Sequence, residues 1–435
     1  MTRALLLALL LASASVAQVT PLERDPAPAV PGLDPASPAG RAFADGWDAY
    51  TRLEFVEAAE RWREAADLGE SPGARAWLAD ALRRLGQQTQ DEALVHEGIG
   101  EARCVLAADR CDAPAHLVIA NAYRTQFFAW SGAAADSVAR HLDRALACDP
   151  DDGNVWDAVW AGAVRLGDAE AESEALRQLH RVEFWTPPVV AFARWVLRSL
   201  PEDAVLLTNG DADTSPNRIL QEVEGLRPDV LIVNVPMLEL PEVARRIAEA
   251  DGLPLPDTVE AFESRYDPRG SVSTPEGRIY SLRDAVLDAW LAAHFDGTFG
   301  RPLVAAITMD PDVLGTKTGV VDRGAHLAPS DVLDYDFDAD AAREAVADLD
   351  GAAFVGPLVS PADRSPVRRM MPFDPAGVAL FQALQTAVAL AQGGDAAGAE
   401  AVYAQAVDFA AAAGRADDPL VAVARQWIDD ATDAP

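Results

Sequence analysis

The sequence predicts helical hairpins on both sides of a central α/β domain that holds a small, mostly parallel sheet. Three observations lead to this fold class. Apolar and small residues recur at helical spacing over 41–184, short β-branched runs alternate with helical stretches over 185–360, and helical spacing returns over 361–435. With 435 residues the chain exceeds one typical hydrophobic core, so two or three structural units are expected.

The N-terminal segment, residues 1–17, is predicted to be a signal peptide. Arg3 supplies a positive charge, an apolar stretch extends to about Leu11, and small residues lead to a cleavage point near Ala17. This prediction places the mature chain in the periplasm or outside the cell. Residues 18–40 are rich in proline and alanine and are expected to form a flexible linker. Every later apolar run is shorter than the ~20 residues of a membrane span, so no span is predicted.

The composition is strongly acidic. The chain has 69 aspartates and glutamates against 36 lysines and arginines, which gives a formal net charge of −33. Such a surface repels nucleic acid and anionic lipid head groups, so neither is expected as a partner. Abundant carboxylates together with arginine in place of lysine are typical of a GC-rich genome or of adaptation to high salt. We interpret the charge in this way rather than as a functional acidic surface.

Residues 41–184 are expected to form about four helical hairpins. Small residues let two helices approach closely, and aromatic rings fill the space between hairpins. In the first hairpin such residues follow one another at offsets of 4, 8, 4 and 3; they are Gly46, Tyr50, Ala58, Trp62 and Ala65. This pattern resembles the tetratricopeptide repeat. The resemblance implies a stack of hairpins whose concave surface recruits a protein partner, and a non-repeating helical bundle is the alternative.

The cysteines and histidines of this region do not have the spacing of metal ligands. Cys104 and Cys111 can pair in an oxidising compartment only if the helix ends between them, and the stretch 109–114 has the residues of a helix end. The histidines have no partner four residues away along the helix, so we interpret them as ordinary surface or packed residues; they are His96, His116, His141 and His180.

The central region, 185–360, is expected to build the sheet. A strand, a helix and a second strand form a βαβ unit, whose short, β-branched runs are typical of strands buried on both faces. This unit predicts a Rossmann-like domain. The expected elements are strand 204–208, helix 216–225, strand 230–235, helix 241–251, helix 282–295, strand 303–308 and strand 353–358.

Helical spacing dominates the C-terminal region, 361–435. Helices are predicted over 378–392, 396–413 and 419–431. The turn Gly393-Gly394-Asp395 joins the first two helices, which favours one more hairpin of the repeat type.

The loop after the first predicted strand is the strongest candidate for a site. It runs from Asn209 to Asn217, at the carboxyl end of a strand and before a helix, where open α/β sheets bind ligands. Two carboxylates in this loop supply the hard oxygen ligands that a divalent cation prefers. The predicted ligand-binding residues are Asn209, Asp211, Asp213, Thr214 and Asn217, with Asp211 and Asp213 as the metal ligands.

Several interpretations of this Asp-x-Asp pair stay open. Such a pair holds a metal and a nucleotide sugar in glycosyltransferase-type sites, supplies the nucleophile in haloacid dehalogenase-type sites, and opens calcium-binding loops. In a purely structural role, the carboxylates cap the following helix and close its turn. No catalytic residue is assigned, and no cofactor is expected other than the divalent cation of the metal-binding interpretation.

A second charged pair precedes the strand at 230–235. Arg227 and Asp229 lie on either side of Pro228. We interpret them as an ion pair that fixes the turn, with a substrate clamp as the alternative.

The residues around the Asp-x-Asp loop resemble a known family. They are similar to the segment after the membrane spans in a bacterial family of uncharacterised membrane proteins, which are related to eukaryotic protein O-mannosyltransferases with C-terminal tetratricopeptide repeats. The resemblance implies a soluble accessory fold beside repeats, and Ala212 and Ser215 differ from the family's usual Asn and Phe. The matching positions are Thr208 to Asp211, Asp213-Thr214, Gln221 to Gly225, Arg227, Asp229-Val230 and Asn234.

These observations predict an exported binding or scaffold protein rather than an enzyme. In this prediction the repeats recruit a protein partner, and the α/β domain is an accessory module. The family resemblance implies an envelope glycan or the glycosylation machinery as the setting. The alternative is a metal-dependent enzyme of glycosyl or phosphoryl transfer, or a glycosyltransferase accessory, that uses Asp211 and Asp213.

Overall fold

The computed structural model describes residue 30 and the ranges 33–69, 72–124, 132–256, 271–273, 279–309, 318–358, 360–362 and 374–432. The chain divides into two compact units, one of Met1–Ala161 with Pro361–Pro372 and one of Gly162–Ser360 with Phe373–Pro435. The predicted signal peptide and most of the predicted linker lie outside the described residues. The end of that linker is helical, because Ser37 caps a helix that starts at Pro38 and accepts the Gly40 N–H at 2.9 Å.

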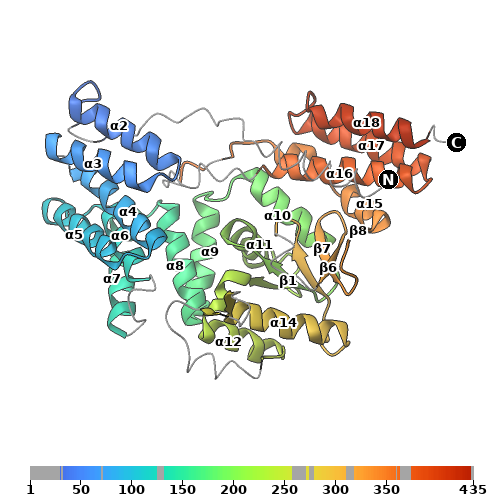
Figure 1. Ribbon diagram of the computed structural model, residues 1–435, viewed down its shortest axis with the longest axis horizontal. Helices are drawn as coiled ribbons and strands as arrows, with labels where there is room; N and C mark the ends of the chain where they lie inside the picture. Colours follow the sequence, from blue (N-terminus) through green and yellow to red (C-terminus); the bar gives the residue numbers. More distant parts are fainter. Residues whose placement is uncertain are drawn as a thin grey trace. The chain divides into compact units, whose positions relative to one another are not determined.

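Helices of the first unit pack in consecutive pairs (Figure 1). α2 packs on α3, α4 on α5 and α6 on α7, while α3 contacts α4 and α5 contacts α6. The predicted helical hairpins are therefore present in this unit. The helices are α2 (Pro38–Thr51), α3 (Phe55–Gly69), α4 (Pro72–Thr89), α5 (Glu92–Ala108), α6 (Ala113–Tyr123), α7 (Gly132–Cys148) and α8 (Gly153–Leu166), whose last residues belong to the second unit.

A glycine and two aromatic rings explain how the first hairpin closes. Trp62 of α3 is fully buried, and its Nε1 donates to the Phe43 carbonyl at 3.1 Å. A Cβ on Gly46 would lie 2.6 Å from the Trp62 ring, so glycine is needed for α2 to approach α3 this closely. The Tyr50 ring centroid lies 5.0 Å from that of Trp62. The small and aromatic residues of the sequence pattern are thus the contact residues of the hairpin.

The last helix of the predicted repeats departs from the stack. α9 (Ala169–Arg181) lies in the second unit and packs on α11 (Asp211–Glu224) of the central region. Arg218 of α11 forms an ion pair with Glu172 of α9 at 2.8 Å. The predicted fourth hairpin is therefore replaced by a contact with the α/β part of the molecule.

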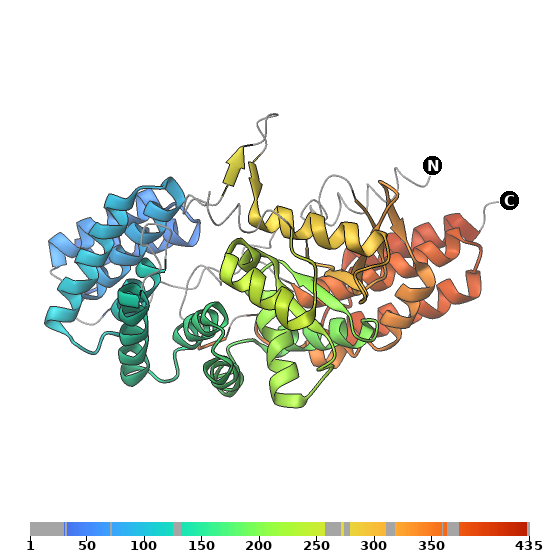
Figure 2. The same cartoon turned by 90° about the horizontal axis from the view of Figure 1, so that it is seen from below.

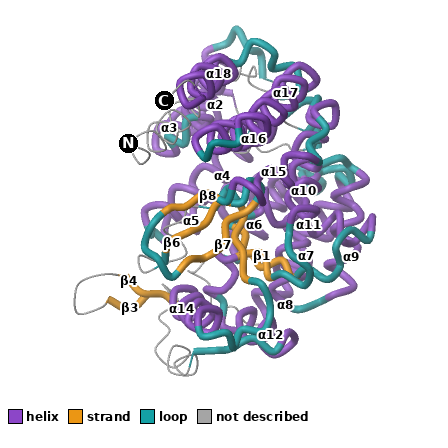
Figure 3. Tube along the Cα trace, turned by 90° about the vertical axis from the view of Figure 1, so that its right-hand side faces the viewer, coloured by secondary structure: helices purple, strands orange, loops and turns teal. Residues whose placement is uncertain are grey.

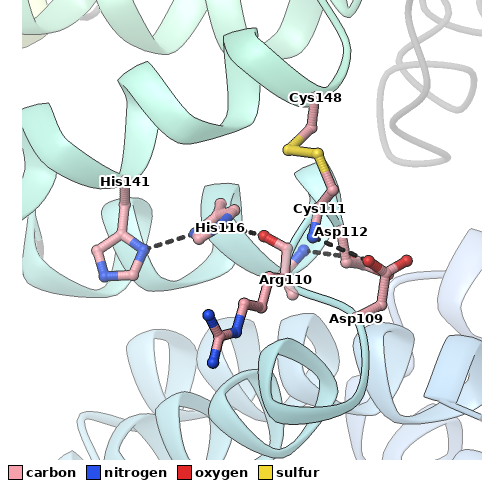
Figure 4. Close-up of a disulfide and its surroundings, with 8 residues drawn as sticks. Asp109, Arg110, Cys111, Asp112, His116, His141 and Cys148 are labelled. Atoms are coloured by element: carbon pink, nitrogen blue, oxygen red, sulfur yellow. Dashed lines mark hydrogen bonds between the residues drawn. A yellow bond between two sulfur atoms is a disulfide. The ribbon is translucent and has the colours of Figure 1, made fainter.

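One disulfide links two helices of the first unit. Cys111, in the turn after α5, is bonded to Cys148 at the end of α7, and their Cα atoms are 5.2 Å apart (Figure 4). Cys104 is an exposed free thiol. The pairing of Cys104 with Cys111 that the sequence leaves open is therefore wrong. α5 continues to Ala108, so Cys104 remains on the helix while the packing of α7 brings Cys148 to the turn.

The second unit contains a six-stranded mixed sheet with the strand order β2-β1-β5-β7-β6-β8. β1 is parallel to β2 and β5, β7 runs antiparallel to β5 and β6, and β8 is parallel to β6. Five of the six strands therefore run in one direction, and the reversed strand β7 makes the sheet mixed. The strands are β1 (Val205–Thr208), β2 (Leu231–Asn234), β5 (Leu303–Ala306), β6 (Gly319–Asp322), β7 (His326–Ser330) and β8 (Tyr335–Phe337).

Helices cover both faces of this sheet (Figure 3). On one face, Leu206 of β1 packs in a cluster with residues of α10, α11, α15 and α16. On the other face, Val205 and Leu207 pack with α12 and α14. Successive residues of a strand point to opposite faces, so a strand covered on both sides needs a continuous apolar run. The further helices are α10 (Pro187–Ser199), α12 (Pro241–Asp251), α14 (Leu282–Phe295), α15 (Ala339–Ala347) and α16 (Pro375–Gln392).

A separate antiparallel hairpin of β3 (Ser271–Ser273) and β4 (Ile279–Ser281) leads into α14 (Figure 2). α14 starts directly after β4 because Ser281 and Asp284 cap it reciprocally. Ser281 Oγ accepts the Asp284 N–H at 3.2 Å, and Asp284 Oδ2 accepts the Ser281 N–H at 2.9 Å. The predicted bounds of this helix are confirmed.

Other predictions for the central region are wrong. The helix after β1 begins at Asp211 and contains Pro216, whereas the sequence favours a start at the proline. The predicted strand 353–358 is instead the end of a 3-10 helix, Gly351–Phe354, and a loop. β6, β7 and β8 are absent from the prediction because they are short, and β7 contains Pro329.

The C-terminal helices α16, α17 (Ala396–Ala412) and α18 (Pro419–Thr432) pack on one another. The predicted hairpin of α16 and α17 is confirmed. Its turn uses Gly394 at a φ of 89°, and Asp395 caps α17 by accepting the Gly398 N–H at 2.9 Å. Their buried residues belong to the same core cluster as Leu206 of the sheet. These helices therefore complete the core of the α/β unit.

The described part of the chain contains sixteen α-helices. Not one of these helices combines the length and the apolar character that crossing a membrane requires.

Candidate functional site

The carboxyl ends of β1 and β5 form the point at which the chain reverses direction across the sheet. From β1 the chain passes through α11, on one face, to β2. From β2 it passes through α12 and α14, on the other face, to β5 on the opposite side of β1. Loops that leave neighbouring strands toward opposite faces open the crevice where α/β sheets bind ligands. The predicted loop Asn209 to Asn217 lies at this position.

Asp213 fixes the entry into α11. Its Oδ1 accepts the Gly210 N–H at 2.9 Å and its Oδ2 accepts the Asn209 N–H at 3.0 Å. The Thr308 hydroxyl, two residues beyond β5, donates to Oδ2 at 3.0 Å. Burial raises the pKa of the Asp213 carboxyl, while the hydrogen bonds from Asn209, Gly210 and Thr308 act in the opposite direction. The carboxylate therefore caps the helix and also joins the loop after β1 to the segment after β5.

Asn209 is exposed, whereas Thr214 and Asn217 of the same loop are buried. Thr214 is buried, and its Oγ1 lies 2.6 Å from Thr208 Oγ1 and 2.6 Å from the Gly210 carbonyl. Asn217 is also buried, and its Nδ2 donates to the Asp213 carbonyl at 2.6 Å. Within the described ranges, Asn217 Oδ1 has no hydrogen-bond partner, and the same is true of Asn234 Oδ1 at the end of β2. Both atoms are buried acceptors at this edge of the sheet.

Asp211 lies in a different environment from Asp213. Asp211 is exposed in the first turn of α11, where its negative charge interacts favourably with the helix dipole. A divalent cation shared by the two carboxylates would compete with the N–H groups and the hydroxyl that donate to Asp213. In the described part of the chain, no three His, Cys, Asp or Glu side chains gather so that they could hold a metal ion. Metal binding by Asp211 and Asp213 stays a prediction.

The predicted ion pair before β2 is present. Arg227 Nε and Nη2 donate to Asp229 Oδ1 and Oδ2 at 2.9 Å and 2.7 Å. The same guanidinium donates to the Leu197 and Leu200 carbonyls at 3.0 Å and 2.8 Å, at the end of α10. A cation at the carboxyl end of a helix satisfies carbonyls that have no partner within the helix. Arg227 therefore joins α10 to the turn before β2, as the structural interpretation expects.

Two histidines of the first unit form a contact that the sequence does not predict. His116 of α6 and His141 of α7 lie with their Nδ1 atoms 2.9 Å apart, close to the Cys111–Cys148 disulfide (Figure 4). The two residues are 25 positions apart, so no local spacing announces them. His96 also has a partner, because its Nε2 lies 3.3 Å from Glu92 Oε1, one helical turn earlier. The contact of α6 with α7 creates the His116–His141 pair, and the sequence pattern could indicate only that each histidine lies on a helix.

Comparisons with known proteins identify a part of the second unit. Residues 189–271 match the family described as TMEM260-associated domain 2. Protein O-mannosyl-transferase TMEM260 of Mus musculus is 43% identical over 60 residues, which are 13% of this chain and 8% of the mouse protein. The chain thus spans less than a tenth of the curated relative that it matches. The predicted resemblance to proteins related to protein O-mannosyltransferases is confirmed for this segment.

Proposed function

We propose that this chain is an exported, non-catalytic binding protein whose helical hairpins recruit a protein partner beside an α/β accessory module. The observation that carries the proposal is the role of Asp213. Both oxygens of this carboxylate accept backbone N–H groups, and Thr308, in the segment after β5, donates to one of them. The residue that a metal-dependent mechanism would need at its centre is thus part of the fold.

The finer description of both units belongs to the same proposal. β1, α11 and β2 form a parallel βαβ unit, and the crossing point at β1 and β5 favours a Rossmann-like origin for this half of the sheet. In the first unit, the Gly46 and Trp62 contact supports a tetratricopeptide-type stack. Stacked hairpins offer an extended surface that is typical of peptide and protein recognition.

The glycosylation machinery of the cell envelope is the setting in which we place the partner. The support for this setting is the match of residues 189–271 to TMEM260-associated domain 2 and the likeness to a protein named as an O-mannosyl-transferase. The expected role is recruitment of an envelope protein or glycan rather than transfer of sugar.

Cys104 offers a direct test of recruitment because it is an exposed free thiol on α5, within the hairpins. A photo-crosslinker attached to Cys104 of the purified mature chain should capture the same envelope protein in repeated extracts. The matched control carries Cys104→Ser together with Val423→Cys, which moves the thiol to an exposed position on α18. Equal capture from both positions, or capture from neither, would contradict recruitment by the hairpins.

The enzyme alternative makes a different prediction about Mg²⁺ and Mn²⁺. A metal site at Asp211 and Asp213 would raise the melting temperature in the presence of the ion, and Asp211→Asn would abolish the rise without removing the helix cap. The binding proposal expects no metal-dependent rise and no turnover of nucleotide sugars. A rise that disappears in Asp211→Asn would replace the proposal with the enzyme alternative.

A further inference from the structure

A cavity of about 500 Å³ opens in the first unit beside the disulfide. Small-molecule sites usually have volumes of ~300–1,000 Å³, so this cavity is large enough for an organic ligand. Its walls come from the end of α5, the turn before α6, α6 itself and the last turns of α7. The lining residues are Leu106, Arg110, His116, Arg144, Ala147 and Cys148.

The two arginines of the cavity have no carboxylate partner. In the part of the chain that the structure describes, neither Arg110 nor Arg144 forms an ion pair, although the net charge of the chain is −33. Elsewhere arginines do find carboxylates, as Arg75 does with Glu101 at 2.9 Å. A guanidinium stays charged at any physiological pH, so two of them at one cavity leave a positive charge unbalanced. An anion from solution can supply the balance.

His116, which lines the cavity, is neutral near pH 7 together with its partner His141. His116 Nε2 donates to the Arg110 carbonyl at 3.2 Å, so His116 Nδ1 must accept from His141 Nδ1–H at 2.9 Å (Figure 4). Burial lowers the pKa of both imidazoles, and for His141 a charged His116 and the guanidiniums of Arg144, Arg140 and Arg103 lower it further, to about 4. The pair thus holds the Arg110 backbone in place without adding charge.

The remaining wall is apolar. Leu106, Ala147 and the disulfide-bonded Cys148 also line the cavity. Arg110 and Arg144 are exposed, so their guanidiniums are reached from solvent. An anion that carries an apolar or neutral organic portion matches both kinds of lining.

We propose that this cavity binds a small organic phosphate. The guanidiniums of Arg110 and Arg144 hold the phosphate, whose two charges match two cations and whose oxygens accept paired N–H groups. The organic portion packs against Leu106, Ala147 and Cys148. This inference concerns a small molecule and does not depend on the protein partner proposed above.

Calorimetric titration of the purified mature chain with phenyl phosphate tests the inference. Binding is expected, with weaker binding of inorganic phosphate, which lacks the organic portion, and of benzoate, which carries one charge. Arg110→Gln and Arg144→Gln should each weaken phenyl phosphate binding at least about tenfold, because each removes charge-assisted hydrogen bonds. Arg140→Gln, on the same helix but outside the cavity lining, should change the affinity less than about twofold.

Four results would overturn the proposal. No binding of phenyl phosphate by the folded chain would remove the site, and an equal loss in Arg140→Gln would show only a general attraction to positive charge. Benzoate binding as tight as phenyl phosphate would assign a carboxylate site, and inorganic phosphate binding as tight would exclude a role for the organic portion. Circular dichroism of each variant separates a lost contact from a lost fold, since both lining arginines are exposed.

Discussion

The Asp213 loop of the second unit and the arginine cavity of the first unit use their charged groups in opposite ways. Both carboxylate oxygens of Asp213 accept hydrogen bonds inside the protein, from two backbone N–H groups and the Thr308 hydroxyl. The guanidiniums of Arg110 and Arg144 are exposed to solvent, and neither forms an ion pair in the described ranges. A charged group that the fold already satisfies stabilises structure, whereas a charged group that the fold leaves unsatisfied is available to a ligand.

The way each region is held differs as well. The cavity lies between α5, α6 and α7, and a covalent link from Cys111 to Cys148 joins two of its walls. The Asp213 loop is held by hydrogen bonds alone among the contacts described for it. Substitutions in the two regions should therefore change the free energy of unfolding by different amounts and with a different dependence on pH.

The largest effect is expected from Cys111→Ser. The disulfide closes a separation of 37 residues, and loss of such a link lowers the free energy of unfolding by about 3 to 4 kcal/mol in the chain-entropy account. Urea unfolding of the variant, with hydrogen exchange of the α6 and α7 peptides, measures the loss. Cys104→Ser is the matched control, because it removes an exposed free thiol and should stay within about 0.5 kcal/mol of the wild type. Equal losses in the two variants would contradict the assigned pairing.

Asp213→Ala is expected to have the next largest effect. The substitution removes the acceptor of two backbone N–H groups and one hydroxyl, which should lower the free energy of unfolding by about 2 kcal/mol. Hydrogen exchange of peptides from α11 would show the loss as faster exchange at the start of that helix.

Two milder variants grade this effect. Thr308→Val removes one of the three hydrogen bonds and should lower the free energy of unfolding by about 1 kcal/mol. Asp211→Asn, at an exposed position in the same turn, should change it by less than about 0.5 kcal/mol. If Asp211→Asn were as damaging as Asp213→Ala, the comparison between a structural carboxylate and an exposed one would fail.

The dependence of stability on pH separates the two regions most clearly. The folded-state pKa of His141, about 4, lies below the unfolded value of ~6.5, so the unfolded chain binds more protons between these values. The contribution of neutral His141 to the stability of the first unit is therefore fully present above pH ~6.5 and is lost as the pH falls toward about 4. Because His141 is only half-buried, we expect a loss of about 1 kcal/mol after allowance for solvent screening.

His141→Gln should flatten this pH dependence relative to the wild type. The difference between the two urea-unfolding series, measured from pH 7 to pH 4, isolates the contribution of the pair from the carboxylates that titrate in the same range. Parallel series would show that the His116–His141 contact does not favour the neutral imidazoles. Asp213 should behave in the opposite way. Because its pKa is raised in the folded state, the folded chain binds more protons at this group, and its contribution to the free energy of unfolding falls as the pH rises above ~4.

Local patterns in the sequence were sufficient for much of the architecture. The offsets of Gly46 and Trp62 identified a hairpin, the apolar run at 204–208 identified a strand covered on both faces, and the helical stretch at 282–295 identified α14. Each of these signals depends on residues within a few turns of one another or on the alternation of a single strand. The positions of the Asp-x-Asp loop and of the Arg227–Asp229 pair followed from the same local rules.

Tertiary structure alone decided which strands pair, which cysteines bond and which charges stay unsatisfied. Three contacts join residues that are not neighbours along the chain: the pairing of β5 with β7, the disulfide from Cys111 to Cys148 and the contact of His116 with His141. Spacing along a chain cannot encode such distances, because they result from how complete helices and strands pack. For the same reason the Asp-x-Asp pattern drew attention to Asp213, whose two oxygens accept hydrogen bonds within the fold. No such pattern announces the cavity at Arg110 and Arg144, where, in the described part of the chain, packing leaves both guanidiniums without a carboxylate partner.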